Sequence, residues 1–192
     1  MNKTYFDSLL NALNTIHPLS EELTNDIVNR VQLRKFGKKE IVLREGETNS
    51  YLYYVKSGIL RAYYEKNAEE VTNWFMSEGD FIVSVFSFFT RNPSYEFIEV
   101  LKDSELVMIH FDDLNYLYNK HLEFNIVGRK LTEWYYVKSE ERLFAMRKQR
   151  ALERYEHLLA NYPELISQVP GKYLASYLGM TLETLSRIKN KV

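Results

Sequence analysis

The residues best suited to chemistry lie near the C-terminal end of the chain, where polar and basic side chains follow one another at helical spacing. Arg187 can form two hydrogen bonds with a guanine in the major groove of DNA, and Glu183 can accept one from a cytosine amino group. Serine and threonine hydroxyls suit contacts to phosphates. These residue types favour DNA binding. The candidate DNA-contacting residues are Lys172, Thr181, Leu182, Glu183, Thr184, Ser186, Arg187 and Lys189.

Apolar spacing in the same segment predicts how such a face is held. Two helices that pack across a tight turn need a small residue where they approach and a residue that tolerates a left-handed backbone at the turn. Ala175 and Gly179 occupy these positions, and Thr181 can cap the second helix. The pattern predicts a helix-turn-helix with helices over 171–178 and 182–191; an ordinary helical hairpin is the alternative. The apolar packing positions are Leu174, Leu178, Met180, Leu185 and Ile188.

The charge of the chain is unevenly distributed. The net charge of the 192 residues is −1, but residues 1–128 carry −6 and residues 129–192 carry +5. A basic C-terminal part suits a polyanionic partner, because neutralising phosphates releases counterions. Ordinary surface charge is the alternative reading of the same asymmetry. A hydrophobic content of 45% is enough for one large or two small globular domains.

Several classes of site are not expected. The chain has no cysteine, which excludes disulfides, thiolate zinc sites and cysteine-ligated iron–sulfur clusters. A phosphate-binding glycine loop, a nucleophile elbow and a zinc-protease motif are missing, so we expect neither an enzyme nor catalytic residues. Neither a membrane span nor a signal peptide is recognisable, so we expect a cytoplasmic protein. No metal site is expected, because surface or capping roles suit the histidines, which are His17, His110, His121 and His157.

The elements that must position the C-terminal residues change in character along the chain. Helical spacing covers 5–30, where Pro18 divides the segment and Ser20 is a good start for a second helix. Short runs rich in β-branched and aromatic residues follow up to residue 110, separated by turn signals, which predicts an antiparallel sandwich or barrel. Helical spacing then returns. The expected strands are 31–36, 40–44, 51–56, 59–64, 71–76, 95–100 and 105–110.

The predicted fold class is therefore α+β: an N-terminal antiparallel β-roll, a long helix over 121–144 and a small C-terminal helix-turn-helix domain. We expect a sensory domain at 1–145, including the N-terminal helices and the long helix, and a DNA-binding domain at 146–192. One recognition helix contacts few base pairs, so a dimer is expected. The apolar residues of the long helix could form the dimer seam, pack on the β-roll, or do both on different faces. They are Leu122, Ile126, Leu131, Trp134 and Tyr135.

This arrangement resembles the Crp/Fnr family of transcription regulators over nearly the whole chain. The resemblance implies a jelly-roll-like, cyclic-nucleotide-binding-like domain, a homodimer along the long helix and double-stranded DNA as partner. It also implies base contacts from Leu182, Glu183 and Arg187, although members often have arginine at the position of Leu182. The most specific matching segments are 53–58, 78–81, 103–109 and 178–188.

The ligand site departs from the family pattern. Nucleotide-binding members hold the ribose with a glutamate and the cyclic phosphate with an arginine–serine pair. Alignment places these positions at Ser84, and at Ser94 and Tyr95. A buried phosphate without a guanidinium partner is costly, so a cyclic nucleotide is not the expected effector, unless a loop shift brings in Arg91. The effector stays unknown. The candidate pocket residues are Phe81, Ser84, Val85, Ser94, Tyr95 and Trp134, with core packing as the alternative for most of the apolar run 81–89.

Two functions are therefore expected in order of preference. The first is a DNA-binding regulator in which a change at the β-roll shifts the long helices and re-aims the recognition helices. The second is a small-molecule-binding or protein-interaction module whose helical tail does not recognise DNA. The sequence ends at Val192, without the β-hairpin wing that often follows the recognition helix in the family, which keeps the second function open.

Overall fold

The computed structural model describes residues 3–190, which fold into two compact units. The first unit holds the residues up to Ala62 together with Phe75–Glu133, and the second holds Tyr63–Trp74 together with the residues from Trp134 onward. The division between the two units falls inside one uninterrupted helix, α5 (Leu122–Lys148). The tip of a long hairpin packs with the C-terminal helices. The predicted boundary between residues 145 and 146 stays a prediction about folding domains.

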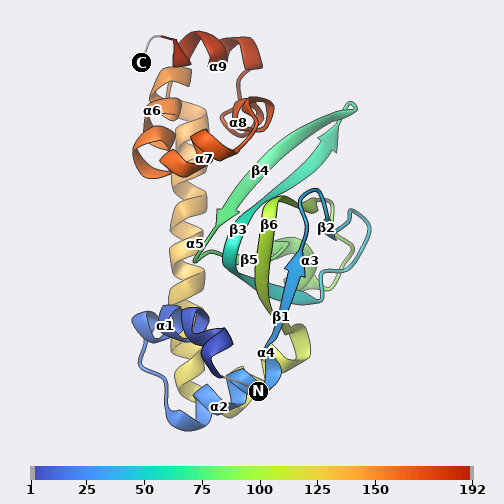
Figure 1. Ribbon diagram of the computed structural model, residues 1–192, viewed down its shortest axis with the longest axis vertical. Helices are drawn as coiled ribbons and strands as arrows, with labels where there is room; N and C mark the ends of the chain where they lie inside the picture. Colours follow the sequence, from blue (N-terminus) through green and yellow to red (C-terminus); the bar gives the residue numbers. More distant parts are fainter. Residues whose placement is uncertain (1–2, 191–192) are drawn as a thin grey trace. The chain divides into compact units, whose positions relative to one another are not determined.

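One sheet forms the β-roll, in the order β1-β6-β3-β4, with β2 beside β6 and β5 beside β3 (Figure 1). The pairs β1–β6, β2–β6 and β3–β5 are antiparallel, and the first runs in register from Gln32 opposite Met108 to Phe36 opposite Ser104. The strands are β1 (Gln32–Phe36), β2 (Ile41–Leu43), β3 (Tyr51–Lys66), β4 (Glu69–Ser77), β5 (Phe81–Ile82) and β6 (Phe97–His110).

Two of the expected chain breaks are not turns. β3 and β6 are each one long strand where the sequence predicts two, separated at 56–58 and at 102–103. Gly58 has a φ of +110°, and a Cβ at this position would overlap the side chain of Ser104 on β6. The glycine is therefore needed where the two strands approach closely, and its turn-like signal marks a local irregularity inside a continuous strand.

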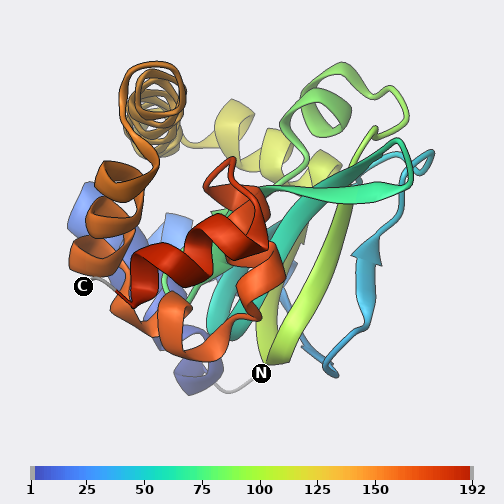
Figure 2. The ribbon, with the colours of Figure 1, turned by 90° about the horizontal axis from the view of Figure 1, so that it is seen from above.

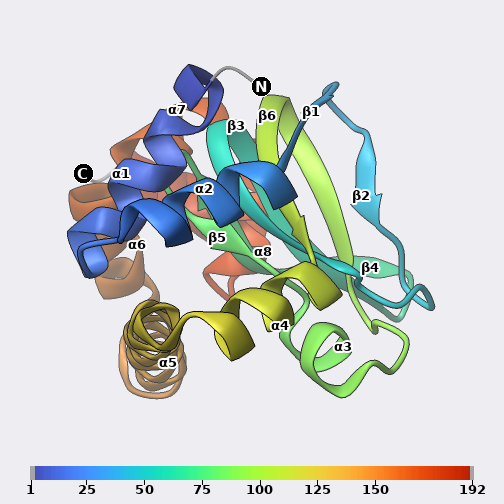
Figure 3. The same ribbon diagram turned by 90° about the horizontal axis from the view of Figure 1, so that it is seen from below.

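Helices close one end of the first unit, where α1, α2 and α4 gather (Figures 1 and 3). Their buried faces share a core with the sheet and with the first turns of α5, including Leu13, Ile27, Leu117 and Val127. The predicted start at Ser20 is confirmed, because its side chain accepts a hydrogen bond from the N–H of Leu23. These helices are α1 (Asp7–Ile16), α2 (Glu21–Arg30) and α4 (Phe111–Lys120), preceded by a 3₁₀ turn (Lys3–Phe6).

The second unit contains the remaining helices. Its core is made by side chains such as Leu158, Leu165, Leu174 and Leu185. Figure 2 shows α9, drawn in red, on the face of this group that is turned toward the viewer. The predicted α+β class with a β-roll, a long helix and a C-terminal helix-turn-helix is confirmed. The helices that follow α5 are α6 (Ala151–Asn161), α7 (Pro163–Gln168), α8 (Gly171–Tyr177) and α9 (Leu182–Lys189).

Within residues 3–190, no helix combines the length and the apolar composition needed to cross a bilayer.

Candidate nucleic-acid interface

The turn between α8 and α9 has the geometry that the spacing predicts. Gly179 adopts a left-handed backbone with a φ of +62°, and the N–H of Met180 donates to the carbonyl of Ala175 at 3.0 Å. Ala175 is buried where the helices approach, as are the packing positions Leu174 and Leu185. A helix-turn-helix therefore forms. Its second helix is held by buried apolar side chains, which leaves its opposite face exposed.

The start of α9 is capped as expected. The hydroxyl oxygen of Thr181 accepts a hydrogen bond from the N–H of Thr184 at 3.2 Å. Glu183 lies in the first turn, and Arg187 and Lys189 lie in the last turn. Both charge placements oppose the helix dipole, so they stabilise α9 as well as presenting polar groups to solvent.

The outward face of α9 gathers most of the predicted DNA-contacting residues. Leu182, Glu183, Ser186 and Arg187 are exposed and, with Thr181, line a shallow hollow on the surface. Lys189 is exposed nearby on the same helix, whereas Thr184 is half-buried and bonded to Thr181. Lys172 is exposed at the start of α8 and lies over the ring of Tyr173. Whether these side chains contact DNA stays a prediction.

An arginine that the sequence analysis missed holds the turn from inside the unit. Arg154 on α6 donates from Nε to the carbonyl of Leu178 at 2.8 Å and from Nη2 to the carbonyl of Gly179 at 3.4 Å. A third hydrogen bond joins its Nη1 to the carbonyl of Gln149 at 2.6 Å. Charge-assisted hydrogen bonds are stronger than neutral ones, so this side chain fixes the position of the turn relative to α6.

The tip of the β3–β4 hairpin holds α8 through one serine. The Oγ of Ser176 accepts a hydrogen bond from the N–H of Thr72 at 2.9 Å and donates to the carbonyl of Glu70 at 3.2 Å. Thr72 is buried at this contact. The first helix of the helix-turn-helix is thereby joined to a strand through main-chain groups, and no local sequence signal announces this pairing.

The predicted nucleotide slots lie side by side inside the β-roll. Ser84 and Ser94 are both buried, and their Oγ atoms are 3.0 Å apart in a hydrogen bond. The N–H of Ser84 donates to Oδ1 of Asn49 at 2.8 Å, and the hydroxyl of Ser94 donates to the carbonyl of Glu96 at 2.9 Å. The two positions therefore lie next to each other, and their hydroxyls hydrogen-bond to one another.

Comparison with known proteins gives one family match for the segment that contains these slots. Residues 33–121 match the family model of the cyclic nucleotide-binding domain. This segment is therefore similar to that domain. The chain has no significant match among curated protein sequences.

Solved structures extend the likeness beyond the cyclic nucleotide-binding domain. FixK2 from Bradyrhizobium japonicum is 20% identical with a TM-score of 0.71, covering 84% of this chain and 83% of that one. The c-di-GMP-responsive global regulator CLP from Xanthomonas campestris is 19% identical with a TM-score of 0.68, covering 90% and 91%. The catabolite activator protein of Thermus thermophilus is 19% identical with a TM-score of 0.58, covering 94% and 85%. The resemblance to Crp/Fnr regulators is thus confirmed as a likeness of fold.

The other predicted effector residues are dispersed. Val85 is 63% exposed, because part of the apolar run forms a short helix, α3 (Val85–Thr90), and Tyr95, after this helix, is 57% exposed. Phe81 packs its ring on Tyr54 in the core of the β-roll unit. Trp134 belongs to the other unit. Among the predicted pocket residues, Ser84 and Ser94 are joined by a hydrogen bond.

The nearest candidate for a replacement cation, Arg91, already has a structural role. Its Nη1 donates to the carbonyls of Asn49 at 2.7 Å and Phe88 at 3.2 Å, and its guanidinium lies 4.2 Å from the ring centre of Phe111. A loop shift that moved Arg91 toward Ser94 would break these contacts. Arg91 therefore stabilises the loop of the β-roll that contains it.

An ion pair inside the β-roll was not expected from the sequence. The side chain of Arg61 on β3 is 1% exposed, and its Nη2 lies 2.6 Å from Oε2 of Glu99 on β6. Burying the charge of Arg61 without this partner would cost several kcal/mol. The sequence gives no sign of the pairing, because no motif surrounds Arg61.

Two of the histidines occupy capping positions, as expected. His110 caps the start of α4 by accepting from the N–H of Asp112, and His121 is the C-cap residue of the same helix. His121 is buried, with Nε2 2.8 Å from Oδ2 of Asp26. Glu22, Asp26 and His121 lie close enough to share a metal ion. The ammonium of Lys120 contacts both carboxylates, at 2.9 Å and 2.7 Å, and so supplies the positive charge there.

The proposed seam residues on α5 do not share one environment. Leu122 is 83% and Trp134 47% exposed, whereas Ile126, Leu131 and Tyr135 are half-buried. Leu131 lines a small apolar cavity inside the first unit, which favours packing on its own domain. Other exposed apolar side chains of the same helix lie outside the predicted seam set. They are Tyr136, Val137, Leu143, Phe144 and Met146.

Proposed function

We propose that this chain is a DNA-binding transcription regulator of the Crp/Fnr type. The observation that carries the proposal is the exposed face of α9, where Glu183, Ser186 and Arg187 project to solvent while Leu185 and Ile188 anchor the helix. A helix held from behind in this way can enter the major groove without unfolding its own domain. The excess of basic residues over 129–192 supports binding to a polyanion.

The proposal includes a homodimer built on α5. Leu122, Tyr136 and Leu143 are exposed and recur at multiples of seven residues, which is the spacing that keeps one face of a helix against a partner helix. Arg129 occupies the remaining position of this series and forms an ion pair with Glu133 at 2.7 Å. Two subunits would present two recognition helices to adjacent turns of the duplex, which supplies the specificity that one helix lacks.

The regulatory part of the proposal is that the β-roll responds to an effector other than a cyclic nucleotide. Ser84 and Ser94 offer no charge to a phosphate, and their hydroxyls bond to each other. An effector shifts the conformation only if its affinity differs between the two arrangements of the recognition helices. CLP is described as c-di-GMP-responsive, so this cyclic dinucleotide is the compound whose binding would contradict this part of the proposal.

DNA binding is tested with the purified chain and a fluorescent duplex from its own promoter region, beside a shuffled duplex of the same base composition. We expect tighter binding to the promoter duplex, with both affinities falling as salt rises. Equal affinity for both duplexes at every salt concentration would contradict sequence recognition. It would favour the alternative of a binding module whose helical tail does not recognise DNA.

The dimer is tested separately by light scattering during gel filtration. Tyr136→Glu and Leu143→Glu place a charge in the proposed seam and should yield monomers. The control is Leu159→Glu, which changes an exposed apolar residue of α6 in the same way. If all three variants keep the subunit number of the parent chain, the seam lies elsewhere.

A further inference from the structure

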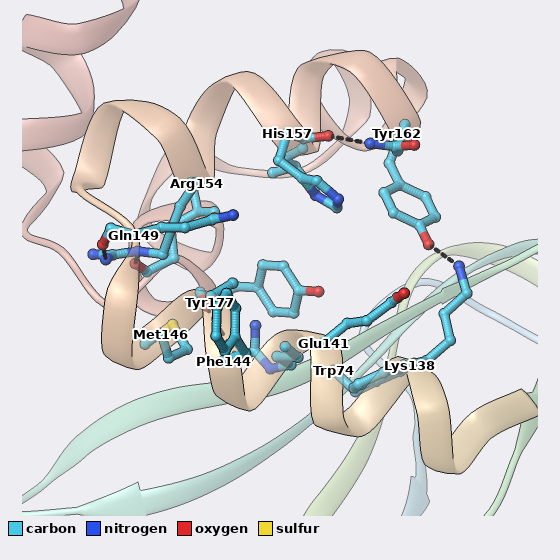
Figure 4. Close-up of a pocket in the computed structure, with 15 residues that line it drawn as sticks. Trp74, Lys138, Glu141, Phe144, Met146, Gln149, Arg154, His157, Tyr162 and Tyr177 are labelled. Atoms are coloured by element: carbon cyan, nitrogen blue, oxygen red, sulfur yellow. Dashed lines mark hydrogen bonds between the residues drawn. The ribbon is translucent and has the colours of Figure 1, made fainter.

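The second unit contains a cavity of about 420 Å³ between α5, α6 and the end of α8 (Figure 4). Trp74 on the hairpin contributes to its wall, and every lining residue belongs to this unit. The volume lies in the range of small-molecule sites in proteins. None of the residues considered for DNA contact or for the nucleotide slots lines it.

The cavity is basic. Lys138, Arg142 and Arg154 line it, against one carboxylate, that of Glu141. The ammonium of Lys138 donates to the hydroxyl of Tyr162 at 2.7 Å, and Nη2 of Arg142 donates to the carbonyl of Tyr177 at 3.0 Å. Across residues 3–190, these three basic side chains form no ion pair. Their hydrogen bonds go to neutral oxygens, and the carboxylate of Glu141 is the one acidic group among the lining residues.

Burial makes this imbalance costly at Arg142. Removal from water lowers the pKa of its guanidinium, while the ring and hydroxyl of Tyr177 act in the opposite direction. A charged group that loses hydration without gaining a counter-ion destabilises its surroundings. An anion placed between Lys138 and Arg142, one turn apart on α5, would offset that cost. The arrangement therefore favours an anionic ligand.

Flat side chains form much of the remaining wall. The guanidinium of Arg142 lies 3.8 Å from the ring centre of Tyr177, and Trp74, Phe144 and Tyr162 also line the cavity. In Figure 4 the hydroxyl of Tyr177 and the ring of His157 point into the space. Aromatic and guanidinium planes bind flat rings by stacking, so the ligand should have a planar part as well as a charge.

We propose that this cavity binds a small planar aromatic molecule that carries a carboxylate or a phosphate group. Lys138 and Arg142 hold the anion, and the aromatic walls hold the ring. This site is separate from Ser84 and Ser94, and it does not depend on DNA binding by the chain. It has a route to the helix-turn-helix nonetheless, because Arg154 lines the cavity and bonds to the turn at Gly179.

Titration calorimetry of the purified full chain tests the proposal with four probes. The ligands 2-naphthoate and 1-naphthyl phosphate represent the two possible sources of the anion. The control 2-naphthalenemethanol keeps the ring without the charge, and cyclohexanecarboxylate keeps the charge without the aromatic ring. We expect at least one of the aromatic anions to bind, and both controls to bind at least about tenfold more weakly, a difference of about 1.4 kcal/mol.

The location of the bound probe is tested by fluorescence. The chain has two tryptophans, so Trp134→Phe leaves Trp74 as the single reporter in the cavity wall. Binding of the aromatic anion should change the emission of Trp74 with the midpoint found by calorimetry. Binding heat without any change in this emission would place the probe elsewhere and overturn the proposal.

Matched variants test the charges. Lys138→Gln and Arg142→Gln should each weaken binding of the aromatic anion about tenfold, and Arg142→Lys should restore part of the loss. Arg147→Gln removes an exposed charge from the same helix outside the cavity and should have no effect. Should Arg142→Gln fail to fold, as circular dichroism would show, Lys138→Gln decides alone. Unchanged affinity in Lys138→Gln, or no binding of either aromatic anion at millimolar concentration, would refute the site.

Discussion

The Oγ atoms of Ser84 and Ser94 lie 3.0 Å apart inside the β-roll. Ten residues separate them, the same separation as between the ribose-binding glutamate and the phosphate-binding arginine expected from the family resemblance. The two positions are adjacent, but each carries a small neutral hydroxyl where the family pattern has a charged side chain. The two hydroxyls hydrogen-bond to each other instead of offering a charge to a ligand.

We predict that cyclic AMP and cyclic GMP do not bind. A phosphate at Ser94 would lack a guanidinium, and Arg91 is held by the carbonyl of Asn49 and by the ring of Phe111. Burying an anion without such a partner is unfavourable. Calorimetry with either nucleotide should give no binding heat, and the thermal midpoint should not move. A midpoint that rises with nucleotide concentration would contradict this prediction.

The contact between Ser176 and the hairpin should decide how firmly α8 is held. Ser176→Ala removes the acceptor of the buried Thr72 N–H and the donor to Glu70, and leaving buried polar groups unpaired costs about 1–3 kcal/mol. Hydrogen exchange should speed up at Thr72 and along α8. Ser167→Ala changes an exposed serine of α7 and serves as the control. Unchanged exchange at Thr72 in Ser176→Ala would show that the contact contributes little.

Acid should destabilise the chain in part through Asp26. Hydrogen bonds from Lys120 and His121 hold the pKa of Asp26 below its ordinary value of 3.8, although burial acts in the opposite direction. Because the folded-state pKa is the lower one, the stabilisation is complete above the unfolded-state value and is lost as pH falls through the folded-state value. Asp26→Asn should therefore be less stable than the parent chain at neutral pH.

The same variant should also lose less stability in acid. The measurement is urea unfolding from about pH 6 downward through the region below about pH 4. The gap between parent chain and Asp26→Asn should narrow as pH falls. Glu45→Gln, which changes an exposed carboxylate, should run parallel to the parent chain. A constant gap between Asp26→Asn and the parent chain would argue against the stated role of Asp26.

The features of the fold that could be predicted from sequence depend on neighbours along the chain. The left-handed Gly179, the cap at Thr181 and the apolar spacing of α8 and α9 all act within about twenty residues, where one helical period reveals them. The start of α2 at Ser20 is of the same kind. Local rules are sufficient for such elements because their hydrogen bonds close locally.

The features that the sequence did not reveal depend on residues distant along the chain. Ser176 meets a hairpin residue more than a hundred positions earlier, and Gly58 is required by Ser104 on a neighbouring strand. The bonds from Arg154 to the turn follow from how α6 packs, and no period marks them. Ser84 and Ser94 are an intermediate case. Alignment with the family pattern located the two positions, but only the structure shows that their hydroxyls hydrogen-bond to each other.

The face of α9 allows base recognition and backbone binding to be separated. Arg187 can bond a guanine with two hydrogen bonds, so Arg187→Ala should cost about 1–3 kcal/mol at one base position and relax the preference there. Lys189 is exposed in the last turn of the same helix and is assigned to phosphate. Lys189→Ala should weaken binding to all duplexes alike. The number of counterions released on binding, which the salt dependence measures, should fall by about one. Fluorescence anisotropy with duplexes that each carry one changed base pair distinguishes the two effects. If Arg187→Ala lowers the affinity for every duplex by the same factor, Arg187 contacts the backbone, and sequence recognition must come from other residues of α9.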